Sequence, residues 1–285
     1  AEHPKPKGGD GFERKLTKWM ADRDAKLVKK MTKEELRAAW VTLIGRGLPA
    51  FKDITRDEVD EMKRDGYNVY TDILRLKAHG EVLPVVSLYP TGVKWNKKVA
   101  IGIMGEGKGS LFDEEGEPVE PVRRMLAAGY SVVSADLFQQ GEFLEGGESP
   151  AQTRKVANIR EYAGYSFGYN HTLFAHRVHD ILTLVAWVNG YDEEKPEAVY
   201  LVGMEGAGPW VAAARALVGD ALDKVAVDTQ GFRFADLKSY RDPNFIPGAV
   251  KFGDVPGLLS LSDGPLWVEG EGREPDTGVV DWLMK

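Results

Sequence analysis

A chain of 285 residues with 43% hydrophobic content is long enough to bury one large core. Its formal net charge of −7 excludes an electrostatic footprint for nucleic acid or for an anionic membrane surface, and favours a small uncharged or sugar-like ligand. Because cysteine is absent, disulfides, zinc–thiolate sites and thiol nucleophiles are excluded. We also expect no cofactor and no metal.

No run of about 18 unbroken apolar residues occurs in the sequence, and no charged segment followed by an apolar one opens it. We therefore expect a soluble protein that binds neither a membrane nor nucleic acid. The chain begins either as a mature product after cleavage or as a fragment of something longer. Its compartment stays open, and a secreted or periplasmic location fits a processed chain.

Two helices are expected near the N-terminus, after a polar arm of residues 1–10 that is rich in Lys, Pro and Gly. The first covers about residues 12–30. Thr32 and Glu35 form a capping box for the second, which ends near Gly45. Because these amphipathic helices precede any strand, they must pack on the outside of the sheet or against another domain.

A β-hairpin is predicted next, because two β-rich runs, Val69–Lys77 and Val82–Tyr89, flank the turn His79-Gly80-Glu81. From there apolar strands alternate with helices. The strands are expected at residues 99–104, 130–135, 198–203, 225–228 and 266–269, and the helices at about 119–128, 171–188 and 211–217. This alternation predicts an α/β protein with a mostly parallel central sheet and helices on both faces.

These patterns divide the chain into an N-terminal arm with a helical extension, residues 1–65, and an α/β domain, residues 66–285. After the last expected strand only residues 270–285 remain. That length is too short for another helix, strand and loop. We therefore expect an α/β domain that lacks a last strand and the loop that would follow it.

The segment around Glu205 combines a buried strand, Ala198–Gly203, a turn dense in glycine, Gly203–Gly208, and a helix, Val211–Leu217. This order is typical of the nucleophile elbow of α/β-hydrolases, a strained strand-to-helix turn that lifts one side chain clear of the backbone. Glu205 stands where a serine is expected. The motif therefore predicts the fold more strongly than it predicts serine chemistry.

Several motifs occur in a characteristic order along the chain. They are Gly164-Tyr165-Ser166-Phe167-Gly168-Tyr169-Asn170-His171, Arg177-Val178-His179-Asp180-Ile181-Leu182, Gly203-Met204-Glu205-Gly206-Ala207-Gly208, Phe245-Ile246-Pro247-Gly248 and Asp254-Val255-Pro256-Gly257-Leu258. Together they resemble bacterial acetyl xylan esterase-like α/β-hydrolases over roughly residues 65–272. The resemblance is closest to the second hydrolase-like half of tandem members, and it implies that the intact serine elbow lies in the other half.

The histidines of this chain do not follow the order of a hydrolase triad, in which the nucleophile comes first, the acid second and the histidine after the last strand. They are His3, His79, His171, His176 and His179, and all precede Glu205. Both the serine nucleophile and the general base of the family pattern are therefore absent. This departure puts ordinary acyl transfer by the chain alone in doubt.

Two interpretations of Glu205 remain open. It is either a carboxylate nucleophile, as aspartate is in some enzymes of this fold, or an acceptor of backbone hydrogen bonds in a degenerate elbow. In the second case its oxygens should lie near amides of residues 206–210 or 105–110. Gly105 and Gly107 are expected to allow the close approach of an oxyanion-hole loop, and Gly203 and Gly206 to allow the elbow itself.

Four carboxylates are expected around the carboxyl ends of the strands, where open α/β sheets place their sites. They are Asp136, Asp228, Glu269 and Glu271, and either they form a shared ligand site or solvent surrounds them separately. Five aromatic residues flank this rim in the sequence and either stack on sugar rings or join the core. They are Tyr165, Phe167, Tyr169, Trp210 and Phe232.

Two further motifs are interpreted as structural. Ser166 matches the G-x-S-x-G pattern, but the charged residues 158–162 before it do not form a buried strand, so we expect it to order the approach to the next helix. His176 and His179 form a His-x-x-His pair without a third ligand at a recognisable spacing, and His179 and Asp180 are expected to bond to neighbouring loops.

The sequence thus predicts an α/β-hydrolase-fold domain related to acetyl xylan esterases, with a degenerate triad and a structural, substrate-binding or partner role. The alternative is an active ester hydrolase that uses Glu205 or a site completed by another chain. A third interpretation, a pure interaction module, rests on the N-terminal helices. The expected partners are an acetylated carbohydrate or another small ester, a second hydrolase domain, or further copies of the same chain.

Overall fold

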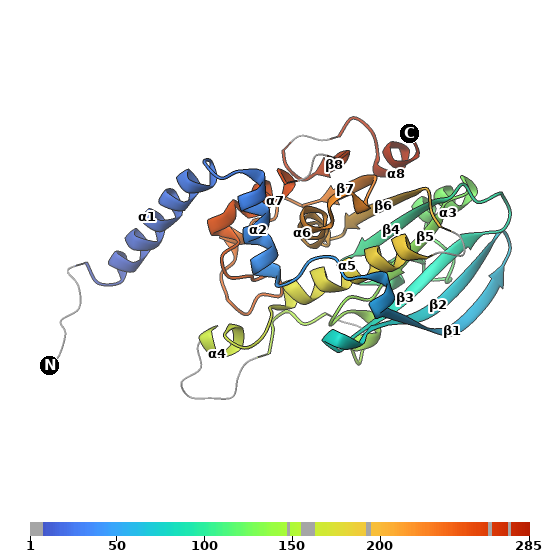
Figure 1. Ribbon diagram of the computed structural model, residues 1–285, viewed down its shortest axis with the longest axis horizontal. Coiled ribbons are helices and arrows are strands. Elements are labelled where there is room, and N and C mark those ends of the chain that lie inside the picture. The colour runs from blue at the N-terminus through green and yellow to red at the C-terminus, as the bar shows by residue number, and fades with distance from the viewer. Residues whose placement is uncertain (1–7, 147–148, 155–162, 192–194, 262–263, 273–274) are drawn as a thin grey trace.

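The computed structural model describes residues 8–146, 149–154, 163–191, 195–261, 264–272 and 275–285. Its central feature is an eight-stranded sheet of order β1-β2-β3-β5-β4-β6-β7-β8 (Figure 1). The strands are β1 Ile54–Arg64, β2 Tyr67–Leu76, β3 Glu81–Pro90, β4 Lys98–Met104, β5 Ser131–Ala135, β6 Ala198–Met204, β7 Lys224–Asp228 and β8 Leu266–Glu269. The first three are antiparallel, β3 joins β5 antiparallel, and the remaining pairs are parallel.

Helices cover both faces of this sheet, as the alternating pattern predicts. They are α1 Asp10–Val28, α2 Lys33–Ile44, α3 Glu120–Ala127, α4 Ala163–Phe167, α5 Leu173–Gly190, α6 Gly208–Val218, α7 Asp254–Leu259 and α8 Val279–Met284. One apolar cluster fills the space between the sheet and α2, α5 and α6, and a second lies under α3 and α8. None of the helices in the described ranges is long and apolar enough to cross a membrane.

The N-terminal helices pack on the outside of the domain. The predicted capping box at the start of α2 is present, with Thr32 Oγ1 accepting from the Glu35 amide and the Glu35 carboxylate accepting from the Thr32 amide. On the inner face of α2, Trp40 is fully buried and its indole N–H donates to the Phe252 carbonyl at 3.2 Å. Burial of this ring ties the helical extension to the sheet domain, and its truncation to alanine should cost about 3 to 5 kcal/mol.

Strand β1 was not predicted, because seven of its eleven residues are charged and no alternating apolar pattern marks it. It precedes residue 66, yet it pairs with β2 along its whole length and forms one edge of the sheet. Backbone pairing with β2 outweighs its poor β-propensity. The charged side chains suit an edge strand, because they oppose pairing with a second sheet.

The segment after β8 contains a short helix, α8, that the sequence patterns did not predict. Its Asp281 carboxylate forms an ion pair with Arg124 of α3, and Leu283 is buried against the second apolar cluster. The Lys224 ammonium group donates to the Leu283 carbonyl at 3.0 Å, which fixes the end of α8. Helix α8 therefore closes the face of the sheet that α3 covers.

Candidate functional site

The turn between β6 and α6 has the geometry of a nucleophile elbow. Glu205 follows the last residue of β6 with a φ of 53°, and Gly206 follows it with a φ of 92°. A non-glycine residue in this left-handed region is uncommon and strained. The strain turns the chain sharply into α6 and leaves the Glu205 side chain exposed.

Glycines let three segments meet at this turn. A Cβ on Gly203 would lie 2.6 Å from a methyl carbon of Val211, and a Cβ on Gly105 would collide with the carbonyl oxygen of Glu205. A Cβ on Gly208 would likewise collide with the carbonyl oxygen of Asp228. The main chains that follow β4, β6 and β7 therefore touch, and only a residue without a side chain fits at these positions.

The Glu205 carboxylate is not held in the way that the sequence predicts. Within the described ranges no backbone amide donates a hydrogen bond to it, and no ion pair or hydrogen bond joins it to a histidine. The expected contacts with amides of residues 206–210 or 105–110 are therefore not formed. Exposure explains this outcome, because the positive φ directs the side chain to solvent, where water hydrates the carboxylate.

The loop after β4 is fastened to the end of β5. Asp136 is 2% exposed, and its carboxylate accepts from the Lys108 amide at 2.9 Å and from the Glu142 amide at 3.0 Å. The Lys108 ammonium group lies 2.5 Å from the same carboxylate and also pairs with Glu142. A Cβ on Gly107 would collide with Asp136, which explains glycine there. Asp136 thus acts as a buried anchor for this loop.

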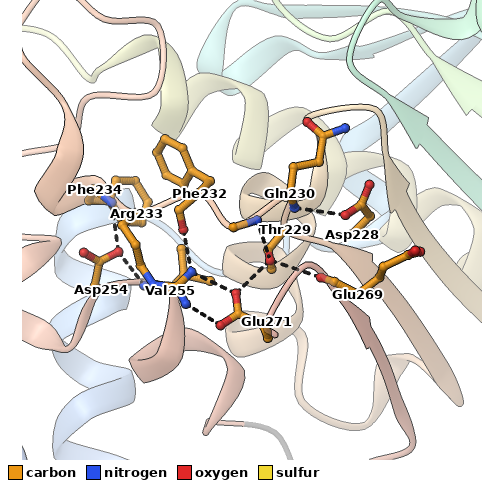
Figure 2. A network of polar contacts seen from close by, with 11 residues as sticks. Asp228, Thr229, Gln230, Phe232, Arg233, Phe234, Asp254, Val255, Glu269 and Glu271 are labelled. Atoms are coloured by element: carbon orange, nitrogen blue, oxygen red, sulfur yellow. Dashed lines mark hydrogen bonds and ion pairs between the residues drawn. The ribbon is translucent and has the colours of Figure 1, made fainter. Parts of the chain in front are cut away.

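The other three rim acids lie at the ends of β7 and β8, where Figure 2 shows a separate polar network. The two carboxylate oxygens of Glu271 accept from the Arg233 guanidinium at 2.8 and 2.5 Å, and one of them also accepts from the Thr229 hydroxyl at 2.7 Å. Asp228 accepts from the Gln230 amide at 2.9 Å. The contact with Glu271 raises the pKa of Arg233 above its ordinary value.

In the part of the chain that the structure describes, no hydrogen bond or ion pair connects Asp136 with Asp228 or Glu271. Lys108 neutralises the first acid, and Arg233 neutralises the last. These pairings give the buried Asp136 and the partly buried Glu271 a structural role in holding loops. A shared ligand site made of the four rim acids stays a prediction.

The three histidines around the start of α5 form a cluster in which the rings meet edge to face. The ring centroids of His171, His176 and His179 lie 5.1 to 5.9 Å apart. The His179 Nε2 lies 2.7 Å from the Ile44 carbonyl oxygen, so this nitrogen carries the proton and donates it. Among the described residues no three His, Asp or Glu side chains are arranged to hold a metal ion.

Burial keeps His179 neutral. Desolvation, assisted by the nearby Arg46 guanidinium, lowers its pKa to about 3. The Glu81 carboxylate, 3.8 Å from His179 Nδ1, does not reverse this effect, because it pairs with Arg46 at 2.9 Å. His179 therefore joins α5 to the end of α2, consistent with the structural interpretation of the His-x-x-His pair.

Arg177 is a buried cation that the sequence motifs did not single out as a contact residue. Its guanidinium lies 4.4 Å from the Trp210 ring centroid and donates to the carbonyls of Phe138 and Gln139 at 3.2 and 3.3 Å. Burial lowers its pKa to about 10. The neighbouring Asp180 accepts from the Phe138 amide at 2.7 Å, and burial raises its pKa. The only signal of these contacts in the sequence was the presence of the charged residues Arg177 and Asp180 inside an otherwise mostly apolar helix.

Ser166 lies inside helix α4, which is not the position of an elbow nucleophile. Residues 155–162 before α4 fall outside the described ranges, so the expected absence of a strand at 158–162 is not tested. Ser166 does line a cavity of about 590 Å³ near the carboxyl end of β5. Other lining residues are Phe138, Gln139, Phe167, Asn170, His171, His176 and Tyr240.

The aromatic residues near the rim are divided between core and surface. Trp210 is buried and donates to the Asn244 side chain at 2.7 Å, and Phe232 packs edge-on against Phe234. Phe167 contacts the rings of Tyr240 and Phe245. Tyr169 is 89% exposed, and the side chain of Tyr165 falls outside the described residues. A sugar-stacking role stays a prediction for this group.

Comparison with known proteins identifies the fold but not a family. No family model and no curated protein sequence matches the chain. Among solved structures, it is similar to a protein assigned as an acetyl xylan esterase from Bacteroides fragilis (TM-score 0.60, 12% identity), covering 83% of this chain and 66% of that one. It is also similar to acetyl xylan esterase 1 from a Thermoanaerobacterium species (TM-score 0.55, 16% identity, 88% and 92% covered).

A third similar structure is a glucuronoyl esterase from Solibacter usitatus (TM-score 0.56, 14% identity), with 87% of this chain and 76% of that one covered. Identities this low carry information about the fold alone. The chain spans about two thirds of the Bacteroides protein. Its mostly parallel sheet with helices on both faces is the α/β-hydrolase fold that these esterases share.

Proposed function

We propose that this chain is a hydrolase-fold domain without acyl-transfer chemistry of its own, acting as the ligand-binding or partner half of a carbohydrate esterase system. One observation carries the proposal. The elbow keeps its strained turn, but it presents an exposed glutamate, Glu205, to which no described histidine is bonded. Acyl transfer by this fold requires a nucleophile and a histidine that accepts its proton.

The histidines in the described ranges lie in other parts of the fold and do not bond to Glu205. His79 lies in the exposed turn between β2 and β3. His171, His176 and His179 meet edge to face near the end of α2, where burial lowers the pKa of both His176 and His179. A neutral imidazole bonded to Ile44 is not placed to activate water at Glu205. An acyl group transferred to Glu205 would therefore have no histidine of the described ranges as a general base for its release.

The 590 Å³ cavity beside α4 is the ligand site that this proposal favours. It lies beyond the carboxyl end of β5, where open α/β sheets bind their ligands. Its wall combines the rings of Phe138, Phe167 and Tyr240 with the amides of Gln139 and Asn170. Flat apolar faces next to amide donors and acceptors suit a neutral, hydroxyl-rich molecule such as an acetylated sugar.

The partner role follows from the same elbow. If Glu205 cannot release an acyl group, a serine elbow on a second hydrolase-like domain would supply the chemistry. The resemblance to the second half of tandem proteins gives the order in which the two halves would follow.

Retention of the elbow geometry favours one competing function. The Glu205 φ of 53° and the close contact between Gly105 and the Glu205 carbonyl are costly features that a purely structural turn does not need. An active ester hydrolase with Glu205 as nucleophile, its base supplied by another chain, would use them. Acetate release by the isolated chain would support this candidate.

Calorimetric titration with acetylated xylotetraose, combined with measurement of released acetate, tests the proposal. We expect binding without acetate release, and about a three- to tenfold loss of affinity in Phe138→Ala. The matched control is Tyr169→Ala, which removes an exposed ring outside the cavity. No binding, or equal affinity in the Phe138 variant and the control, would exclude this cavity as the site.

A further inference from the structure

Helix α1 presents a row of large apolar side chains to solvent. Phe12, Leu16 and Trp19 are between 44% and 58% exposed. On a different face of the helix, Ala21 and the buried Asp24 line a hollow together with residues 245–251, and α1 contacts the turn Val250–Phe252. Figure 1 shows α1 extending away from the body of the domain. An exposed apolar row on a projecting helix is typical of an interaction surface.

The spacing of this row is that of a helix-pairing seam. Phe12, Leu16, Trp19 and Arg23 follow one another at intervals of four, three and four residues, which places them on one face. The Arg23 guanidinium lies 5.2 Å from the Trp19 ring centroid and continues the flat surface of that ring. The seam is therefore formed by a bulky apolar centre with a stacked cation at one end.

We propose that α1 pairs in antiparallel orientation with α1 of a second copy of this chain. The choice of the antiparallel orientation rests on the charged residues that flank the seam. When Leu16 of one copy lies opposite Trp19 of the other, the heptad pattern places Lys15 opposite Asp22 of the other copy, and two-fold symmetry repeats the pair. Lys15 and Asp22 are exposed, and no ion pair among the described residues occupies either of them.

A parallel pair does not use these charges. In that orientation the position of Lys15 faces Met20 of the other helix, and the position of Asp22 faces Leu27. The helix is also poorly suited to bind a membrane surface. It carries five basic and four acidic side chains and so has little attraction for anionic lipid. An antiparallel second copy therefore matches both the apolar row and the charges.

The pair is a weak one. Two helices of this length bury less than the 1,200 to 2,000 Å² of a standard stable interface, so association is expected at concentrations on the order of tens of micromolar. This inference is independent of the proposed function, since it uses no residue of the elbow or of the ligand cavity.

Sedimentation equilibrium of the full chain, from about 1 to 300 µM, tests the pairing by charge exchange. Lys15→Glu and Asp22→Lys should each weaken dimerisation about tenfold, because each places like charges opposite one another twice. The double variant Lys15→Glu with Asp22→Lys should restore it. Residues 15 and 22 are two helical turns apart, so the restoration cannot arise within one helix.

Lys18→Glu is the matched control, because it makes the same charge change on α1 outside the seam and should leave the dimer unchanged. Trp19→Asp should abolish dimerisation while the far-ultraviolet circular dichroism and the melting temperature of the domain persist. A chain that stays monomeric up to 300 µM, or a double variant as weak as the single ones, overturns the proposal. Co-sedimentation of a monomeric chain with phosphatidylserine vesicles would show that the apolar row binds a membrane, and would also overturn the proposal.

Discussion

The main chain of Gly105 lies directly against the carbonyl oxygen of Glu205, so closely that a Cβ at position 105 would collide with that oxygen. The contact joins the loop after β4 to the strained turn after β6. Each segment therefore limits the position of the other. The main chain of Glu205 is thus constrained at its carbonyl group as well as at its φ of 53°.

This contact predicts a difference between two glycines of one loop. Gly105→Ala should lower the free energy of unfolding by about 2 kcal/mol or more, because the added methyl group forces the two main chains apart. Gly109→Ala is the control, since a Cβ at Gly109 meets no atom within 4 Å. Urea denaturation of both variants measures the effect, and equal stability would contradict the close approach.

The elbow conformation predicts a purely conformational penalty at Gly206. A Cβ there meets nothing within 4 Å, but its φ of 92° is poorly tolerated by a β-branched residue. Gly206→Val should therefore lower stability by more than about 1 kcal/mol. Thermal melting measures this, and an unchanged melting temperature would show that the segment is not an elbow.

The buried pair of Lys108 and Asp136 predicts a large effect of removing the cation. In Lys108→Met the Asp136 carboxylate keeps its amide donors but loses its only described cation, which should cost about 3 kcal/mol. The matched control is Lys97→Met, which breaks an exposed pair with Glu197 and should cost less than about 1 kcal/mol. Equal losses in the two variants would show that Asp136 is solvated.

The neutral state of His179 predicts a pH dependence of stability. Its pKa falls from 6.5 to about 3 on folding, so between these values the unfolded chain binds more protons than the folded one. The free energy of unfolding should therefore fall as the pH drops below about 6.5, by at most about 1.4 kcal/mol per pH unit from this group.

His179→Gln should flatten that dependence. Guanidinium denaturation of the wild type and the variant at pH 7.5, 6 and 5 gives the two curves of stability against pH. Parallel curves for wild type and His179→Gln would show that His179 is protonated in the folded protein, as an ion pair with Glu81 would require.

Much of the fold was readable from local patterns, whereas the polar contacts of the site were not. The glycine spacing around Glu205 predicted the strained turn, since such turns depend on adjacent residues. β1 escaped prediction because its pairing with β2 overrides a charged sequence. The contacts of Asp136 with Lys108 and of Glu271 with Arg233 join separate loops, and no local signal in the sequence encodes them.

Hydrolysis of p-nitrophenyl acetate by the purified chain is the most direct test of the absence of acyl transfer. We expect a rate equal to that of a protein control without an active site, and equal rates for wild type, Glu205→Ala and Ser166→Ala, because the described residues contain neither a serine elbow nor a histidine bonded to Glu205. A rate well above the control that disappears in Glu205→Ala would contradict the account and identify a carboxylate nucleophile. A rate that disappears in Ser166→Ala would contradict it as well, and would move the active site to helix α4.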